Sequence, residues 1–346
     1  MKERVQYLTR IRVVASFAIV ILHTFTIFGM AEQGTLSDSE EFATRVVPYL
    51  MMWAVPCFVM VSGALLLDEK REITVSRILR KYVLRMVLVL LLFTTVFYLL
   101  DLWMNADEWS SESVITILGK FFTDGSWAHL WYLYLLIGLY LMLPVYRLVA
   151  KHATREVLIY LGILYVIFLS LIPMLERLTD ASIGFYLCTS SVFPGFFVLG
   201  HLIHTGRFSV KKGVAWGLAA LGAISIVGLT MIDFDEHQDD MDSLLGNYAF
   251  LPVIILSIGC FLLLRGSGKN TASPRAEKLW SFLDRNSFGI YLTHLFFLRW
   301  LIKVVKWNPF ETGSFWMLIP VAIGVFAASL LVTFLLRLIP GLKKLI

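Results

Sequence analysis

Long apolar runs separated by short polar segments extend from one end of the chain to the other. Ten of these runs hold about 17 to 22 residues each, enough for an α-helix to cross a hydrocarbon core of about 30 Å. They lack the alternating pattern of outer-membrane β-strands, and helices satisfy their own backbone groups in lipid. We therefore predict an all-α, polytopic transmembrane helix bundle of about ten spans, near residues 11–30, 46–67, 84–103, 129–149, 156–174, 184–203, 214–232, 247–265, 287–305 and 316–338.

Composition agrees with this pattern and excludes a water-soluble globule. Hydrophobic residues make up 58% of the 346 positions and charged residues only 16%, which leaves too little polar surface for a soluble fold. No connection between the predicted spans is long enough for an independent core, so we expect one integral-membrane domain over residues 1–346. The segment 266–286 begins as a Gly/Ser/Pro linker and then predicts a short amphipathic helix lying on the membrane.

Lysine and arginine residues fall unevenly between the two sides of the predicted bundle. With a cytoplasmic N-terminus, only Arg45, Lys120, Arg177, Arg299, Lys303 and Lys306 lie outside. The positive-inside rule therefore predicts that both termini are cytoplasmic. The net charge of +5 is a signal of topology, so membrane lipid is an expected partner and nucleic acid is not.

The first predicted span carries two ionisable residues, Arg12 and His23, eleven positions apart. In an α-helix this spacing places both side chains on nearly one face, about 16 Å apart along the axis. Arg12 would then lie at the membrane surface and His23 deep within the bilayer. A buried ionisable group in a span indicates a lined cavity or a functional pair, although a histidine satisfied by a neighbouring helix is the structural alternative.

A basic cluster opens the third span and consists of Arg77, Arg80, Lys81 and Arg85. These residues lie on the same predicted side as Arg12, which suits the binding of phosphate groups. Helices that leave the cytoplasm also carry such charges for orientation alone. Near the same side, Ser62 and Gly63 are small enough to permit close approach of another helix.

Several segments together resemble the membrane acyltransferase-3 family. They are the Arg12-to-His23 spacing, VPCFVMVSGALLL in the second span, RILRKYVLRM in the third, HLWYLYLLIGLYLMLP in the fourth, FFVLGHLI in the sixth and NSFGIYLTH in the ninth. Within this family the chain is most similar to the bacterial surface-polysaccharide O-acetyltransferases. The resemblance implies a multi-pass protein of the bacterial cytoplasmic membrane. It also implies transfer of an acyl group, usually from acetyl-CoA, to a hydroxyl of a glycan or lipid-linked glycan.

The resemblance also implies roles for the first three spans. His23 would act as general base or relay the acyl group, and Arg12 would hold coenzyme A phosphates together with the third-span cluster. The family often carries R-x-x-R in the third span. Here Arg85 fits the second position with Tyr82 in the first, while Arg77 and Arg80 restore the pattern one turn earlier. Ser62 is implied as a hydroxyl donor to the pantetheine amides.

Candidate acceptor residues come from the fourth and ninth spans. His129, Trp131 and Tyr132 open the fourth span, where interfacial anchoring and sugar stacking are equal alternatives for the two aromatic residues. His129 either forms a hydrogen bond with the acceptor or is satisfied within the fold. In the ninth span Tyr291 and His294 share one helical stripe. Tyr291 is implied in acceptor binding. His294, near the depth of His23, either orients that imidazole or contacts the thioester, or is a satisfied core histidine.

The chain lacks the sequence motifs of nucleotide-driven proteins and of zinc hydrolases. The chain contains no G-x-x-x-x-G-K-[ST] and no H-E-x-x-H, so we expect neither ATP-driven chemistry nor a metal cofactor. The alternative function is a transporter that moves a small polar solute or nascent glycan through the same bundle. The number of chains that assemble stays open.

Overall fold

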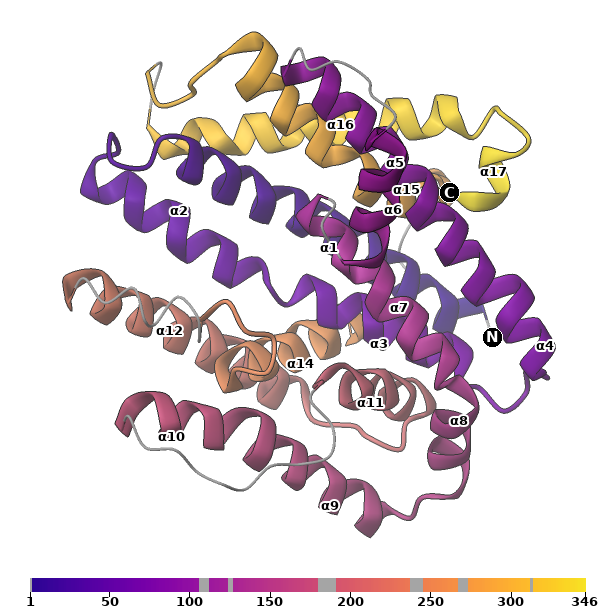
Figure 1. Cartoon of the computed structure of the whole chain (residues 1–346). Helices are drawn as coiled ribbons and strands as arrows, with labels where there is room; N and C mark the ends of the chain where they lie inside the picture. Colours follow the sequence, from indigo (N-terminus) through magenta and orange to yellow (C-terminus); the bar gives the residue numbers. More distant parts are fainter. Residues whose placement is uncertain are drawn as a thin grey trace. The chain divides into compact units, whose positions relative to one another are not determined.

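The computed structural model describes residues 2–105, 112–123, 127–179, 191–236, 245–266, 273–311 and 314–346. Within these ranges the regular structure is entirely helical, which confirms the predicted all-α class (Figure 1). In chain order the elements are α1 (Lys2–Ala31), α2 (Asp38–Met51), α3 (Ala54–Leu66), α4 (Val75–Arg77), the π-helix η1 (Ile78–Val83), α5 (Leu84–Asn105), α6 (Glu112–Phe122), the 3₁₀-helix η2 (Ala128–Leu130), α7 (Trp131–Leu141), α8 (Leu143–His152), α9 (Arg155–Val166), the π-helix η3 (Ile167–Leu171), α10 (Ile172–Thr179), α11 (Phe193–Thr205), α12 (Lys212–Glu236), α14 (Leu251–Gly266), α15 (Pro274–Trp300), the π-helix η4 (Leu301–Val305), the 3₁₀-helix η5 (Phe315–Met317), α16 (Leu318–Leu336) and α17 (Leu342–Leu345).

Fewer helices reach membrane-spanning length than the apolar runs predict. Among the described residues, seven segments are long and apolar enough to cross a membrane, or eight if the bent pair α7 and α8 is one span. That pair, which covers the predicted fourth span, is bent by 59°. The predicted eighth span corresponds to α14, which has only 16 residues, and the sixth falls partly on residues 180–190, outside the described ranges. The predicted side of each terminus stays a prediction.

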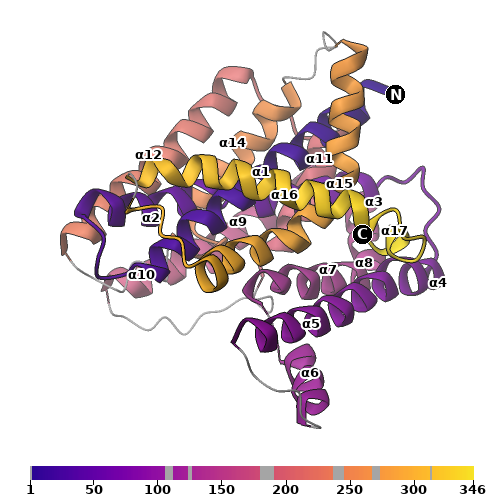
Figure 2. The same cartoon turned by 90° about the horizontal axis from the view of Figure 1, so that it is seen from above.

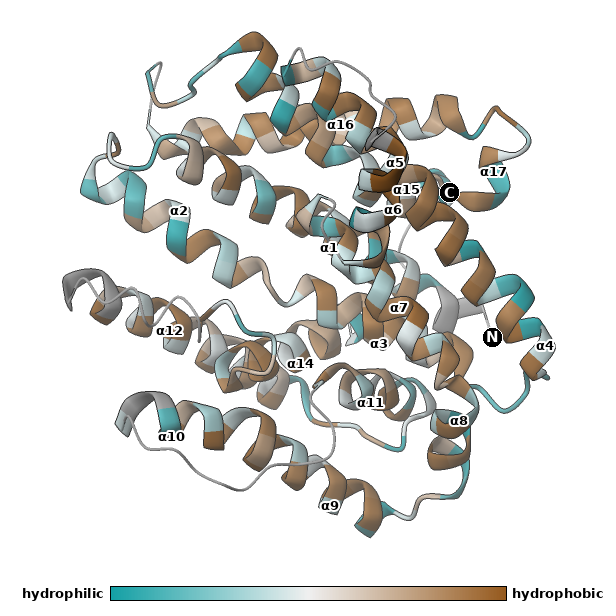
Figure 3. Cartoon of the chain, in the orientation of Figure 1, coloured by the Kyte–Doolittle hydropathy of each residue, from teal (hydrophilic) through white to brown (hydrophobic). Residues whose placement is uncertain are grey.

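Hydropathy follows the helices closely. Hydrophobic colours cover most of the helical surface in Figure 3, while hydrophilic colours gather mainly at helix ends and connections. Many large apolar side chains are exposed to the surroundings, including Ile224 at 70% and Trp216 at 59% on α12. An exposed apolar surface of this extent is stable in lipid and not in water, so the protein is a multi-pass membrane protein.

The expected amphipathic helix before the ninth span is not a separate element. Instead, α15 runs without a break from Pro274 to Trp300, while the linker residues 267–272 lie outside the described ranges. Ser273 accepts a hydrogen bond from the backbone N–H of Ala276, and Pro274 occupies the first helical turn, where its missing N–H costs little. The helix then continues because no further proline interrupts it. Asp284 therefore lies on a regular helix and not in a loop.

The chain divides into two compact units, each made of two chain segments. Unit 1 comprises residues 1–71 and 146–284, and unit 2 comprises residues 72–145 and 285–346. In unit 1, α1 packs against α2 and α3, α3 packs against α11, and α12 packs along α14 (Figures 1 and 2). In unit 2, α5 packs against α6, α7 and α17. The expectation of one domain over residues 1–346 stays a prediction.

Two glycines bring α3 and α11 into backbone contact within unit 1. A Cβ atom on Gly63 would collide with the backbone of Phe197, and one on Gly200 would collide with the backbone of Met60. Both glycines are buried. Small residues permit such close helix approach in membranes, as the Ser62-Gly63 pair predicted.

Alanine at either position should therefore destabilise unit 1. We expect Gly63→Ala and Gly200→Ala to lower the free energy of unfolding by about 1–3 kcal/mol, because the opposing atoms are backbone and the helices must separate. Thermal unfolding of the purified protein measures this. The matched control is Gly217→Ala on α12, where a Cβ meets nothing within 4 Å; a control as destabilised as the two variants would refute the packing argument.

Candidate active site

The site begins with α1, a single uninterrupted helix of 30 residues that carries both Arg12 and His23. On a regular α-helix their two side chains lie on nearly the same face, about 16 Å apart along the axis. His23 is half-buried, whereas Val20 and Thr24 beside it are fully buried. The imidazole thus lies at the edge of the core of unit 1, where a side chain can be held and still meet a substrate.

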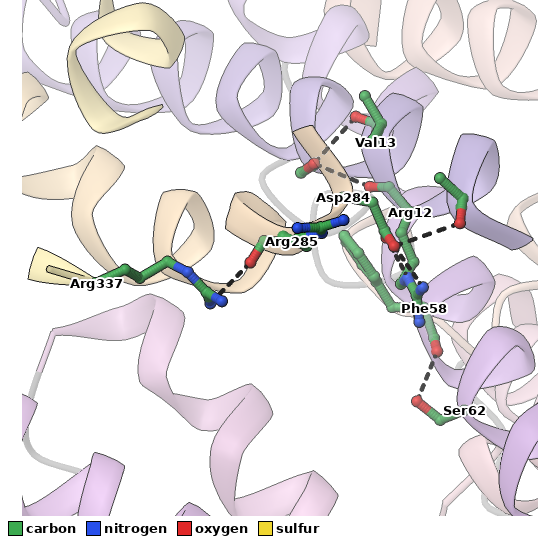
Figure 4. Close-up of polar contacts among 9 residues, drawn as sticks. Arg12, Val13, Phe58, Ser62, Asp284, Arg285 and Arg337 are labelled. Atoms are coloured by element: carbon green, nitrogen blue, oxygen red, sulfur yellow. Dashed lines mark hydrogen bonds and ion pairs between the residues drawn. The ribbon is translucent and has the colours of Figure 1, made fainter. Parts of the chain in front are cut away.

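Arg12 is held by a carboxylate from a distant part of the chain. Its Nε atom donates to Oδ1 of Asp284 at 2.6 Å, and its Nη2 atom donates to Oδ2 at 2.7 Å (Figure 4). The hydroxyl of Thr9, one turn earlier on α1, donates to the same Oδ2 atom at 3.3 Å. This two-point pairing fixes the plane of the guanidinium as well as its position.

The pairing with Asp284 leaves some N–H donors of the Arg12 guanidinium available to bind another anion. Arginine has five N–H donors, and the two bonds to Asp284 use two of them. Within the described residues the other three have no protein acceptor, and 28% of the Arg12 side chain is exposed. A second anion could therefore bind on the open edge of the guanidinium while Asp284 orients it.

Neighbouring polar contacts fix the same end of α1. Gln6 Nε2 donates to Glu277 Oε1 at 2.9 Å, so a second α15 residue meets α1 one to two turns before Arg12. The hydroxyl of Tyr7 lies 2.7 Å from Nδ1 of His204 on α11. Together with the contacts of Thr9 and Arg12, these hydrogen bonds connect the first half of α1 to α11 and to the first part of α15. They fix the position of the helix segment that carries Arg12.

Ser62 lies on α3 in unit 1, where its hydroxyl donates to the carbonyl of Phe58 at 3.0 Å (Figure 4). This bond to the preceding turn is common for serine in helices and needs no ligand. The side chain is half-buried. Close packing of Gly63 against α11 explains why small residues occur here, and the role of Ser62 toward pantetheine stays a prediction.

The basic third-span cluster lies in unit 2, and its members differ. Arg77, Arg80 and Lys81 are exposed at the end of α4 and on the π-helix η1. Arg85, in contrast, donates from Nε to the carbonyl of Leu345 at 3.0 Å, and its guanidinium lies 5.5 Å from the ring centre of Phe288. Arg85 thus holds the C-terminal segment in place by a hydrogen bond. Of the two possible alignments with R-x-x-R, the one formed by Arg77 and Arg80 has both arginines exposed. π-Helical turns occur frequently at functional sites.

Unit 2 also brings together four of the other predicted residues. The Tyr291 hydroxyl donates to the carbonyl of His129, and the His129 Nε2 atom lies 3.3 Å from the carbonyl of Leu292. The rings of His129 and His294 are 5.4 Å apart, and those of Tyr132 and Tyr291 are 5.6 Å apart.

These four side chains are deeply buried. His294 is 0% exposed and His129 is 1% exposed, while Trp131 at the start of α7 is half-buried. The cluster joins η2 and α7 to α15 by aromatic packing, which accounts for its composition. The predicted contacts of His129, Trp131, Tyr132 and Tyr291 with the acceptor, and of His294 with the thioester, stay predictions.

Sequence reasoning missed a second cluster beside these residues. The rings of Phe97 and Trp127 stack with their centres 4.1 Å apart, and the guanidinium of Arg299 lies 4.3 Å from the Trp127 ring centre. Asp101 accepts from the Trp127 indole at 2.9 Å and from Arg299 at 3.0 Å. Asp101 is an acidic residue inside the apolar run of the predicted third span. An ionisable residue within a span indicates a paired or functional group, and this was the signal available in the sequence.

The predicted residues thus fall into two groups. Arg12, His23 and Ser62 lie in unit 1, and the third-span cluster, His129, Trp131, Tyr132, Tyr291 and His294 lie in unit 2. Roles that join the groups, such as His294 orienting His23, stay predictions. Over the described part of the chain, no group of three or more His, Cys, Asp or Glu residues could hold a metal ion.

Comparison with known proteins gives one match. The model of an acyltransferase family, described as an acyltransferase domain, matches residues 5–338. No curated protein and no solved structure matches the chain. The matched range covers nearly the whole chain and contains every candidate residue from Arg12 to His294.

Proposed function

The chain belongs to the acyltransferase-3 family, and from this premise we propose that it transfers an acyl group from cytoplasmic acyl-CoA to a hydroxyl of a cell-surface or lipid-linked glycan. We take acetyl-CoA as the donor and the bacterial cytoplasmic membrane as the location. The observation that carries the proposal is the single helix α1, on which an oriented Arg12 and a half-buried His23 share one face.

The spacing on α1 suits the shape of the donor. Coenzyme A carries its phosphates at one end and its thioester at the end of a flexible arm, whose reach is comparable to the roughly 16 Å between Arg12 and His23. Arg12 would bind phosphate through the donors that Asp284 leaves. That the exposed residues Arg77, Arg80 and Lys81 bind the remaining phosphates stays a prediction from the sequence.

The proposed chemistry needs one base at the thioester. As the acceptor oxygen attacks the thioester carbon, neutral His23 takes the hydroxyl proton. The new C–O bond forms, the C–S bond breaks, and coenzyme A leaves as a thiolate that takes up a proton. In the second route, a His23 nitrogen attacks the thioester carbon first, and the C–S bond breaks as coenzyme A leaves as a thiolate that takes up a proton. The acceptor oxygen then attacks the acyl carbon, the C–N bond to the imidazole breaks, and the freed imidazole takes the hydroxyl proton.

Radiolabelled acetyl-CoA tests the proposal directly. We expect the purified protein in nanodiscs to release free thiol and to label glycan extracted from the native envelope. A protein that neither releases thiol nor labels glycan would contradict the proposal. A transporter would move solute into sealed vesicles without consuming thioester, and the thiol assay on the same vesicles separates the two functions.

A further inference from the structure

A cavity with polar and apolar walls lies at the end of α1 opposite Arg12. It has a volume of about 280 Å³ and is bordered by the last turns of α1, the connection to α2 and most of the length of α2. Figure 1 shows these two helices running side by side and joined at this end. Its polar lining residues are Thr26, Gln33, Glu41, Thr44, Arg45 and Tyr49. All of the cavity lies in unit 1.

The walls of this cavity are fixed by local structure. A Cβ on Gly29 would lie 2.7 Å from the Cβ of Thr44, so α1 and α2 touch closely at the cavity. Gly34 has φ +89°, a left-handed turn that glycine adopts without strain. The backbone N–H of Ser37 donates to the Glu40 carboxylate at 3.0 Å and fixes the start of α2. The cavity is therefore preformed, as small-molecule sites usually are.

The lining chemistry favours a sugar. Glu41 and Arg45 form an ion pair at 2.9 Å, and both side chains are partly exposed, at 43% and 27%. A carboxylate accepts and a guanidinium donates hydrogen bonds, and sugar hydroxyls do both. Tyr49 adds a ring of the kind that packs against the C–H face of a sugar. The volume is near the lower end of small-molecule sites, roughly 300–1,000 Å³, and suits one sugar residue.

The position of the cavity matches the proposed chemistry. Thr26 follows His23 by three residues, about 4.5 Å along the axis, so the cavity begins one turn beyond the imidazole. Met30, also in the lining, lies on the stripe of Arg12 and His23, since 18 residues make five helical turns. Along one helix the order is Arg12, His23 and then the cavity.

We propose that this cavity binds the acceptor sugar, with Glu41 and Arg45 as its main hydrogen-bonding residues. The inference rests on the proposed function and adds to it an acceptor site made only of unit 1 residues, whose lining includes none of His129, Trp131, Tyr132 and Tyr291. The donor would reach His23 from the Arg12 end and the acceptor from the other end. On the predicted topology that other end faces outside, where surface glycans are displayed.

Glu41→Gln and Arg45→Gln test the acceptor site. We expect each to lower acetyl transfer to the surface glycan roughly 10- to 100-fold, the effect of losing a hydrogen bond to a charged group. Mass spectrometry of the glycan from cells lacking the native gene and expressing each variant measures the transfer. Calorimetry of the purified variants should give a wild-type dissociation constant for coenzyme A, because the cavity lies beyond His23.

The control is Asp38→Asn, which removes an exposed carboxylate from the first turn of the same helix, outside the cavity lining. It should acetylate the glycan like the wild type. Wild-type transfer in both cavity variants, an equal loss in Asp38→Asn, or an equal loss of coenzyme A affinity would each overturn the acceptor site. If wild-type cells show no more acetylated glycan than deletion cells, the proposed function itself fails, and the acceptor site with it.

Discussion

His23→Gln should lower acyl transfer by roughly 10²- to 10⁴-fold, the range expected when a positioned general base is lost. Glutamine keeps much of the size and polarity of histidine, but it cannot take the hydroxyl proton or carry the acyl group. The dissociation constant for coenzyme A should not change, because the phosphates bind about 16 Å away at the Arg12 end. Thiol release and calorimetry on the same sample measure both quantities.

His152→Gln is the matched control for this prediction. His152 is exposed at the end of α8, and its replacement should leave turnover at the wild-type rate. Full turnover in His23→Gln would eliminate His23 from the reaction. A parallel loss of coenzyme A binding would instead indicate that α1 is disturbed.

The same assay without acceptor separates the two routes through His23. If His23 relays the acyl group, the wild-type protein should release one thiol per chain in a rapid burst, and His23→Gln should abolish it. If His23 acts only as a base, no burst precedes addition of the acceptor.

Arg12→Ala should weaken coenzyme A binding roughly 10- to 100-fold, because a charge-assisted, forked contact with phosphate is lost. Calorimetry measures this loss. S-Acetylpantetheine, a thioester donor without the adenosine phosphates, supplies a second readout. With this donor Arg12→Ala should turn over as the wild type does, because Arg12 contacts only the missing phosphates.

Two further variants sharpen the test of Arg12. Arg10→Ala removes an arginine from the same turn of α1, two residues or about 200° around the helix, and should bind coenzyme A normally. The double variant Arg12→Ala, Asp284→Ala removes the carboxylate that would otherwise repel phosphate, and it should keep most of the affinity loss. Recovery of wild-type affinity in the double variant would show that repulsion by Asp284, and not loss of the clamp, weakens binding in Arg12→Ala.

The sequence predicted the helices well where lipid dictates the pattern. A long apolar run needs intrahelical hydrogen bonds, so α1, α12 and α16 appear near their predicted positions. The bend between α7 and α8 and the short α14 were not predicted, because composition does not report where a helix breaks. The prediction of a short amphipathic helix that ends before the ninth span was wrong, because no residue between Pro274 and that span interrupts α15.

The site was predictable only within one element. Arg12 and His23 could be paired from spacing, because both lie on one regular helix. Asp284 could not be paired with Arg12, since the two are 272 positions apart and only tertiary packing brings them together. The cavity was missed because Gln33 and Glu41 fall between two predicted spans. In the structure, α2 begins at Asp38, and its residues lie beside the end of α1.

The central claim is that the donor lies along α1, with phosphate at Arg12 and the thioester at His23. Electron cryomicroscopy of the protein with a non-hydrolysable acetyl-CoA analogue tests this most directly. We predict a coenzyme A phosphate bonded to Arg12, which still contacts Asp284, and the thioester mimic within hydrogen-bond reach, roughly 3 Å, of the His23 imidazole. An analogue bound with its phosphates away from Arg12, or with its acyl end away from His23, would contradict the account.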